Sequence, residues 1–339
     1  MPSSDAARGG LLAELLHRGD LDGLVREVDR RAAQQDWDGL IVLMQRCRAA
    51  AEELGKQLWG AAQYAEYRLA LEAPGQYAAA VVVPGAARFA LGPLTEVIAQ
   101  DHHFAEVADH LDEVVAGVVA QERVLRREDL TDDSRARLDD VGLPGRLEPW
   151  EPQYVLPTYR ASERLDGSPP PPTGEPIVVA GPPGRPASLT AVERALVELA
   201  DVWESQSSGE VHAVTVEGGA AGAVAALVPG SARLVPLLLP EAFATMAWAA
   251  ASGGAHGRRR GGAAGRAAAW WLGHAVTGLE FPAGADELEF HLEELSWFAF
   301  DDDRPATGWH LRLAVENAGE GWAAAVDASD HRDDEVDAG

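Results

Sequence analysis

The sequence is nearly devoid of cysteine and lysine. Cys47 is the only cysteine, so an internal disulfide and a cysteine-rich metal site are both excluded. Lys56 is the only lysine, and no glycine-rich loop precedes it, so a Walker-type phosphate loop is excluded as well. The Gly-x-Ser-x-Gly motif of a hydrolase nucleophile does not occur. These absences favour a protein that is not an enzyme, and they predict no cofactor.

Long apolar runs are also absent, because no segment approaches the roughly 20 residues that cross a bilayer. The first five residues have no basic start before an apolar stretch, so we expect no secretory signal, no membrane association and a cytoplasmic location. Acidic residues, by contrast, are abundant. The 54 Asp and Glu outnumber the 28 Lys and Arg and give a formal net charge of −26. A surface of this sign repels nucleic acid.

Residues 1–142 show helical periodicity. Leu21, Leu24 and Val28 recur at a spacing that places them on one face of a helix. The sequence GDLDGLV from residue 19 is echoed by QDWDGLI from residue 35, and both resemble an acidic turn that opens an apolar helix, with Asp20 and Asp38 as the expected caps. Short repeated turns occur in helical solenoids and in plain bundles alike. The sequence therefore predicts an all-helical domain of either kind.

One predicted helix, around residues 104–118, carries an apolar face and a polar stripe. The stripe consists of His103, Glu106, His110 and Glu113. Histidine and glutamate can ligate metals, but a dinuclear site needs matching residues on other helices, and the helical part has no such pairs. We therefore interpret the stripe as a solvated helix face and expect no metal site.

Proline and glycine become frequent between residues 143 and 187, which predicts a connector between two domains. Its clearest element is the run of four prolines at residues 169–172, which favours an extended polyproline II conformation. The earlier part of this segment is aromatic. Trp150, Tyr154 and Tyr159 are candidate partner-binding residues, because aromatic side chains are common anchors in protein interfaces. The same segment is expected to pack across the helical domain.

Residues 188–330 mix helical and strand patterns. A helix is predicted over residues 190–203, a hairpin over residues 211–228, and three strands over residues 295–300, 309–315 and 322–326. The fold class is therefore α+β, with a mainly antiparallel sheet in the second domain. The acidic residues 331–339 are expected to form a disordered tail.

The most distinctive motif is a glycine–arginine loop at residues 253–266, between two predicted helices. Glycine permits close backbone approach, a helix N-terminus offers N–H groups, and arginine binds phosphate or carboxylate. The loop is thus a candidate anion site for a phosphorylated small molecule or nucleotide. In the alternative interpretation its arginines pair with acidic residues of the same fold, such as Glu293, Glu294 or the acids at 301–303. The candidate residues are His256, Arg258, Arg259, Arg260 and Arg266.

Several segments together resemble an uncharacterised family of actinobacterial proteins. They are QLWGAAQYAEYRLAL at residues 57–71, GPLTEV at 92–97, QERVLRREDL at 121–130, LEPWEP at 147–152, and the glycine–arginine loop. The resemblance extends over most of the chain. It implies a bacterial cytoplasmic setting and a recurrent two-part architecture, and it assigns no catalytic residue.

The sequence therefore predicts a noncatalytic protein-binding subunit or adaptor, with a protein as its partner. Two other functions remain open. The first is an enzyme or sensor that binds a phosphorylated small molecule through the glycine–arginine loop. The second is an acidic decoy that occupies a nucleic-acid-binding protein.

Overall fold

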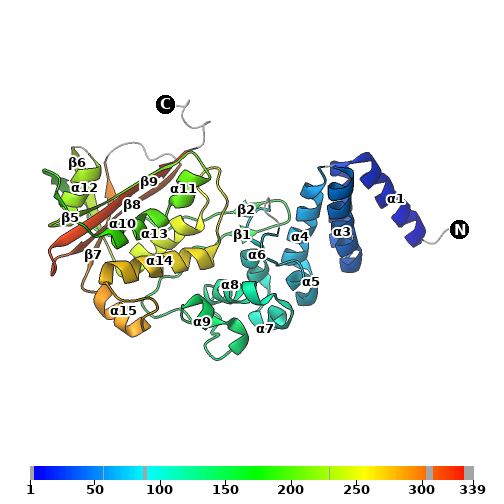
Figure 1. The fold of residues 1–339 in the computed structure, drawn as a ribbon, viewed down its shortest axis with the longest axis horizontal. Helices are drawn as coiled ribbons and strands as arrows, with labels where there is room; N and C mark the ends of the chain where they lie inside the picture. Colours follow the sequence, from blue (N-terminus) through cyan, green and yellow to red (C-terminus); the bar gives the residue numbers. More distant parts are fainter. Residues whose placement is uncertain (1–3, 56, 87–89, 229, 303–307, 332–339) are drawn as a thin grey trace. The chain divides into compact units, whose positions relative to one another are not determined.

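The computed structural model describes residues 4–55, 57–86, 90–228, 230–302 and 308–331, and it divides the chain into two compact units. The helical unit comprises Met1–Arg137 and Pro157–Leu165. The sheet unit comprises Leu138–Leu156 and Asp166–Gly339. Figure 1 labels α1 and α3 to α8 in the first unit and the long strands of the second. The α+β class predicted from the sequence is confirmed.

The helical unit is a stack in which helices pack mainly on near neighbours in the chain. α2 packs on α3 and α4, α4 packs on α6, and α6 packs on α8. This succession of contacts describes an open, solenoid-like stack better than a closed bundle. The helices are α1 (Ser4–Arg18), α2 (Leu21–Ala33), α3 (Trp37–Leu54), α4 (Trp59–Glu72), α5 (Gly75–Ala79), α6 (Leu94–Asp101), α7 (Phe104–Val107), η1 (Ala108–His110), α8 (Glu113–Val124) and η2 (Ser134–Ala136).

Two predicted helix starts in this unit are present. Asp20 accepts a hydrogen bond from the Gly23 amide at 2.8 Å, and Asp36 accepts one from Gly39 at 3.1 Å. Both carboxylates thus cap a first turn. The cap predicted at Asp20 is confirmed, whereas the cap predicted at Asp38 is wrong, because Asp38 lies inside the first turn of α3 and Asp36 caps that turn. The continuous helix expected through residues 104–118 is wrong, because Asp112 caps a new helix with a bond to Val114 at 2.9 Å. Three short elements replace it: α7, η1 and α8.

The expected connector is not a single linker. Its residues Pro157–Leu165 belong to the helical unit, where they form a hairpin of β1 (Thr158–Tyr159) and β2 (Arg164–Leu165). Further along, β3 (Ile177–Ala180) and β4 (Arg185–Pro186) become the two edge strands of the main sheet. Proline-rich sequence is compatible with edge strands because an edge N–H needs no partner.

The sheet unit contains a seven-stranded antiparallel sheet in the order β3-β6-β7-β8-β9-β5-β4. The three strands predicted near the end of the chain are confirmed as its centre, with boundaries that differ by a few residues. The remaining strands and helices are α9 (Leu138–Val141), α10 (Thr190–Glu198), α11 (Asp201–Ser205), β5 (Glu210–Glu217), α12 (Ala220–Leu227), β6 (Ser231–Leu237), α13 (Leu239–Ala251), α14 (Gly262–Thr277), α15 (Ala285–Leu292), β7 (Ser296–Asp301), β8 (Trp309–Asn317) and β9 (Trp322–Asp330).

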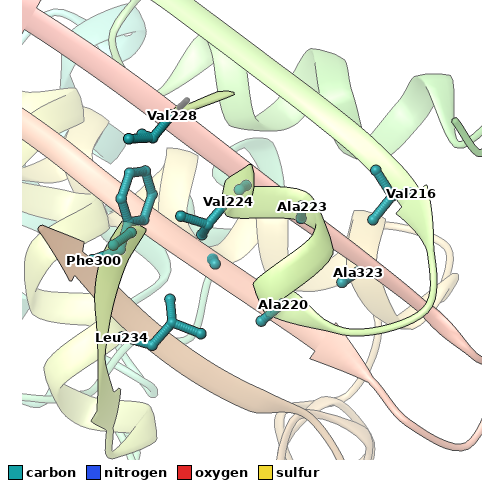
Figure 2. Packing of buried hydrophobic residues seen from close by; sticks show 11 residues of the cluster. Val216, Ala220, Ala223, Val224, Val228, Leu234, Phe300 and Ala323 are labelled. Carbon is teal, nitrogen blue, oxygen red and sulfur yellow. The ribbon is translucent and has the colours of Figure 1, made fainter. Parts of the chain in front are cut away.

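The hairpin predicted over residues 211–228 is wrong. Its second half forms α12, and β5 pairs instead with β9. Ala220, Ala223 and Val224 are buried at helical spacing, and they pack on Phe300 and other residues of the sheet (Figure 2). An apolar run of alanine and glycine suits a helix or a strand, so the pairing of β5 with a distant strand decided between them.

Both faces of the sheet are covered, because neighbouring residues of one strand contact different helices. Val216 on β5 packs in the cluster with α12, whereas Thr215 bonds to Glu193 of α10 at 2.8 Å. Since successive side chains point to opposite faces, α12 and α10 lie on opposite sides of the sheet. The predicted disordered tail at 331–339 lies, apart from His331, outside the described residues.

Candidate functional site

The glycine–arginine loop joins α13 to α14 within the sheet unit, and several of its amides already have acceptors. Ala255 donates to Asp330 Oδ2 at 2.6 Å, and His256 donates to Ser207 Oγ at 3.1 Å. Arg260 donates through its backbone to the Ala251 carbonyl at 2.8 Å. A carboxylate of the chain therefore occupies one position where a bound anion was expected. Asp330 is completely buried, which makes this arrangement part of the core.

Arg266 lies in the core and is fully occupied by protein groups. Its side chain is 0% exposed and forms a bidentate pair with Glu151, with N–O distances of 2.5 and 2.8 Å. It also donates to the carbonyls of Pro144 at 3.0 Å and Arg146 at 2.9 Å. Its guanidinium carbon lies 5.6 Å from the centre of the Trp270 ring. Arg266 is therefore a structural residue, and it is not available to an external anion.

Glu151 is the centre of this buried network. It accepts hydrogen bonds from Tyr154 Oη at 2.6 Å and Trp270 Nε1 at 3.1 Å in addition to those from Arg266. Burial alone would raise the pKa of Glu151, but its bonds to Arg266 outweigh that effect and leave the pKa below its ordinary value. Burial beside this carboxylate raises the pKa of Tyr154 well above its ordinary value. The network thus consists of an ion pair with neutral donors around it.

The three aromatic residues considered as partner anchors are buried. Trp150 packs against Phe243 and Trp270, with ring centres 5.0 and 5.2 Å apart. Tyr154 belongs to the Glu151 network, and Tyr159 lies in the helical unit, where its hydroxyl donates to Glu96 at 2.6 Å. Each contributes to the core of its own unit, so none forms an exposed contact surface. Aromatic content alone did not distinguish a core residue from an anchor.

The remaining loop arginines lie nearer the surface. Arg260 forms an ion pair with Asp201 at 3.3 Å, and Arg258 and Arg259 are also engaged within the chain. The exposed His256 is held through its backbone. Internal pairing, the alternative interpretation of the loop, therefore describes Arg260 and Arg266.

The acids that pair with Arg260 and Arg266, Asp201 and Glu151, differ from those named from the sequence. Asp301 pairs with Arg233 at 2.6 Å and with Arg312 at 3.7 Å, and Asp302 pairs with Arg312 at 2.8 Å. Glu294 lies 3.6 Å from His291. The pairs that Asp301 and Asp302 form depend on the register of neighbouring strands and could not be assigned from the pattern of charges.

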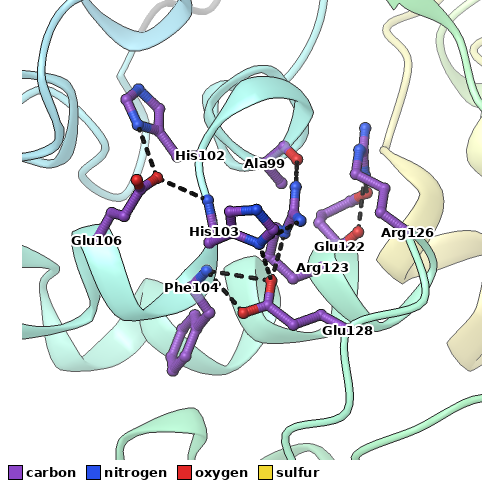
Figure 3. Close-up of polar contacts among 9 residues, drawn as sticks. All are labelled: Ala99, His102, His103, Phe104, Glu106, Glu122, Arg123, Arg126 and Glu128. Atoms are coloured by element: carbon purple, nitrogen blue, oxygen red, sulfur yellow. Dashed lines mark hydrogen bonds and ion pairs between the residues drawn. The ribbon is translucent and has the colours of Figure 1, made fainter.

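Two residues of the histidine–glutamate stripe, His103 and Glu106, belong to a local capping network (Figure 3), whereas Glu113 is exposed and lies 3.4 Å from Arg137. Glu106 accepts a hydrogen bond from the His103 amide at 2.9 Å, while Glu128 accepts one from the Phe104 amide at 3.1 Å and pairs with Arg123 at 2.7 Å. These groups hold the start of α7. Within the described ranges, no group of three or more His, Cys, Asp or Glu side chains is arranged to hold a metal ion.

Sequence reasoning missed a pocket in the helical unit, which we call the α4 pocket. Its volume is about 230 Å³. Gly60, Gln63, Tyr64 and Tyr67 line one side at the spacing of a helix face, and the other side comes from Ala90, Leu91, Ala161 and Ser162. Most of its lining is apolar, and Trp59 beside it is 42% exposed. The helix-spaced aromatics on α4 were the available signal, but they match a core face equally well.

The two tyrosines of the α4 pocket are fixed by internal bonds. Tyr64 donates to Asp29 at 2.6 Å, and Tyr67 donates to the Arg160 carbonyl at 2.5 Å. Burial raises the pKa of Tyr67 to about 12, so its hydroxyl remains protonated at neutral pH. The rings therefore present apolar walls in a fixed geometry, and the pocket is suited to an apolar group.

A larger depression, which we call the α14 groove, lies in the sheet unit and has a volume of about 470 Å³. The C-terminal turns of α14 provide Trp271 and His274, and α10 provides Arg194. The segment that follows α14 adds Glu280 and Phe281. Single polar residues on separate elements give no spacing signal, so the sequence did not reveal this groove.

Comparison with known proteins identifies the family and nothing more specific. Within the described ranges, no helix is both long enough and apolar enough to cross a membrane. No curated protein and no solved structure shows significant similarity to the chain. A family model described as a family of unknown function, DUF6183, matches residues 22–331. The chain therefore belongs to the DUF6183 family of unknown function.

Proposed function

We propose that the protein is a noncatalytic protein-binding subunit or adaptor of a bacterial cytoplasmic assembly. The observation that supports this most directly is the α4 pocket. Its volume of about 230 Å³ is below the roughly 300–1,000 Å³ typical of small-molecule sites, and it suits one large side chain of a partner. Binding energy in protein interfaces is concentrated in such buried anchors.

The surroundings of the pocket also fit a protein partner. Leu21 is 40% exposed, and a Cβ at Gly60 would lie 3.6 Å from it, so Leu21 and Trp59 flank the same stretch of α4. Asp29 and Glu163 of the same unit are about half exposed, although each already pairs with an arginine of the chain, Arg68 and Arg160 respectively. Together with the net charge of −26, they favour a partner segment with one large apolar side chain and basic neighbours.

A phosphorylated ligand in the glycine–arginine loop could not be bound by Arg266, which was the most promising candidate side chain. Arg266 is committed to Glu151, and the Ala255 amide is committed to Asp330. Exposed charge remains on the loop, so co-purification of a nucleotide would still favour that alternative. Occupation of a nucleic-acid-binding protein by the acidic surface remains a third proposal, and it predicts a salt-sensitive partner.

The role of the α4 pocket can be tested with substitutions at two glycines, one at the pocket and one away from it. Gly60→Leu adds an apolar side chain at the pocket, and Gly60 has only ordinary contact space around a new Cβ, so the protein is expected to fold. Leucine also has a higher helix propensity than glycine, by about 1 kcal/mol. Gly10→Leu on α1 is the matched control, because a Cβ there meets nothing within 4 Å.

Tagged wild type and both variants are used to capture partners from the native host, with quantitative mass spectrometry. We expect one stoichiometric partner with wild type and Gly10→Leu, and at least about tenfold less of it with Gly60→Leu. Equal capture by all three proteins, or no stoichiometric partner at all, would refute the pocket as the anchor site.

A further inference from the structure

The α14 groove has the size and chemistry of a small-molecule site. Its volume of about 470 Å³ lies inside the range of roughly 300–1,000 Å³ that such sites occupy. Its lining combines apolar surface with a few polar groups from separate elements. It therefore differs in kind from the smaller, mainly apolar α4 pocket.

Two aromatic rings form part of its wall. Trp271 and Phe281 are each 37% exposed, and their ring centres lie 5.9 Å apart in an edge-to-face arrangement. The position of Phe281 depends on Gly142, which has a φ of +71°, because a Cβ there would lie 2.8 Å from a carbon of the Phe281 ring. Such walls favour a planar aromatic group.

The groove also contains one charge of each sign. Arg194 on α10 is 66% exposed and only loosely paired with Glu198, at 3.8 Å. Glu280, beyond the end of α14, lines the groove and is exposed to solvent. A doubly negative phosphate would meet one cation and one repelling carboxylate, whereas a zwitterion has a complementary charge for each.

His274 adds unused hydrogen-bonding capacity. It is 3% exposed and lines the groove, and neither ring nitrogen forms a hydrogen bond of normal geometry within the described part of the chain, although the nearby Leu279 backbone acts to raise the pKa of the ring. Phe281 stands edge-on to the imidazole, with ring centres 5.0 Å apart. A polar group of a ligand in the groove would therefore lie near a buried imidazole, and a buried polar group with spare hydrogen-bonding capacity gains from such a contact.

We propose that the α14 groove binds a small zwitterionic aromatic compound of the aromatic α-amino acid class. The aromatic ring lies against Trp271 and Phe281, Arg194 binds the carboxylate, and Glu280 binds the ammonium group. This ligand uses both charges and both aromatic walls. The site is separate from the α4 pocket, so the proposal is independent of the proposed adaptor function.

Isothermal titration calorimetry of the full chain tests the proposal with L-tryptophan and L-phenylalanine as probes. We expect saturable binding of at least one of them, with a dissociation constant of a few millimolar or tighter. Indole and tryptamine, which lack the carboxylate, are expected to bind at least about tenfold more weakly than L-tryptophan. Equal binding of indole would contradict the charged part of the site, and no saturable heat with either amino acid would overturn the proposal.

Matched variants locate the binding. Arg194→Gln and Trp271→Leu are each expected to weaken the amino acid about tenfold or more, because each removes one group that contacts it. Arg185→Gln and Phe290→Leu are the controls, since both change exposed residues of the sheet unit that do not line the groove. Binding that survives both groove variants, or that falls equally in the controls, would place the ligand elsewhere.

Discussion

The two ends of α14 make opposite use of polar groups. At its N-terminal end, Arg266 is buried with a bidentate acid, two carbonyls and an aromatic ring around it. At its C-terminal end, His274 is buried with no hydrogen bond of normal geometry in the described structure, beside an open groove. The sequence drew attention to the first end because of its arginines. The comparison shows that a dense run of charge can be satisfied inside the protein, while a single buried polar residue can lie beside an open groove.

The largest expected effect on stability comes from the N-terminal end of α14, where every polar group of Arg266 has a partner. Arg266→Ala or Glu151→Ala leaves a buried charge without its partner, so each should lower the free energy of unfolding by about 3–5 kcal/mol. Urea unfolding followed by tryptophan fluorescence measures the loss. The double variant Glu151→Leu with Arg266→Met should recover much of it, because no charge then remains buried. A loss below about 1 kcal/mol for either single variant would contradict this account of the network.

A smaller effect, dependent on pH, is expected at the open end. Burial lowers the pKa of His274 from its ordinary 6.5, and the backbone of Leu279 offsets part of that shift. As pH falls below 6.5, the unfolded chain takes up the proton first, so the folded state loses stability by up to about 1.4 kcal/mol per pH unit. The loss stops once the pH lies below the pKa of the folded state.

His274→Leu isolates this contribution. The difference in stability between variant and wild type should shift in favour of the variant between pH 7.5 and 5.5, and stay constant above about pH 7.5. His212→Leu, at a histidine whose side chain is 67% exposed, is the control and should show no comparable shift. The same difference at every pH would mean that the His274 side chain does not resist protonation.

The smallest expected effect belongs to the surface of the glycine–arginine loop. Arg260 and Asp201 form an ion pair 3.3 Å long in which both side chains are more than one third exposed. Arg260→Gln should therefore change the free energy of unfolding by less than about 1 kcal/mol, and high salt should reduce the change further. Measuring the free energy of unfolding of Arg260→Gln and Arg266→Ala together would test whether the two arginines differ in their contribution to stability as their burial predicts. Equal losses of unfolding free energy in the two variants would contradict the distinction between an exposed and a buried arginine.

Periodicity and capping predicted the parts of the fold that depend on local chemistry. The acidic cap at Asp20 and the three strands at the centre of the sheet are present as expected, and the second cap lies at Asp36, two residues before the expected Asp38. α12 was mistaken for a strand because its alanines suit either structure, and only pairing between β5 and β9 excludes the hairpin. The position of β3 at the edge of the sheet could likewise not be predicted from the sequence, since its partner β6 lies more than fifty residues away.

The candidate sites were less predictable than the fold. Arg266 and Glu151 stand 115 residues apart, and no local pattern assigns one to the other among 54 acidic residues. The α14 groove collects its polar groups from α10, α14 and the segment after α14. Its composition is ordinary at each of these places, and only their juxtaposition has chemical meaning.

The sequence by itself determined the acidic charge, the scarcity of cysteine and lysine, the α+β class and the membership of a family of unknown function. These properties depend on composition or on contacts within a few residues. Tertiary structure alone decided which arginine is buried, which aromatic residues belong to the core and where the pockets open. The physical reason is that burial and charge pairing depend on residues brought together from distant parts of the chain, because desolvation is set by every neighbour in space.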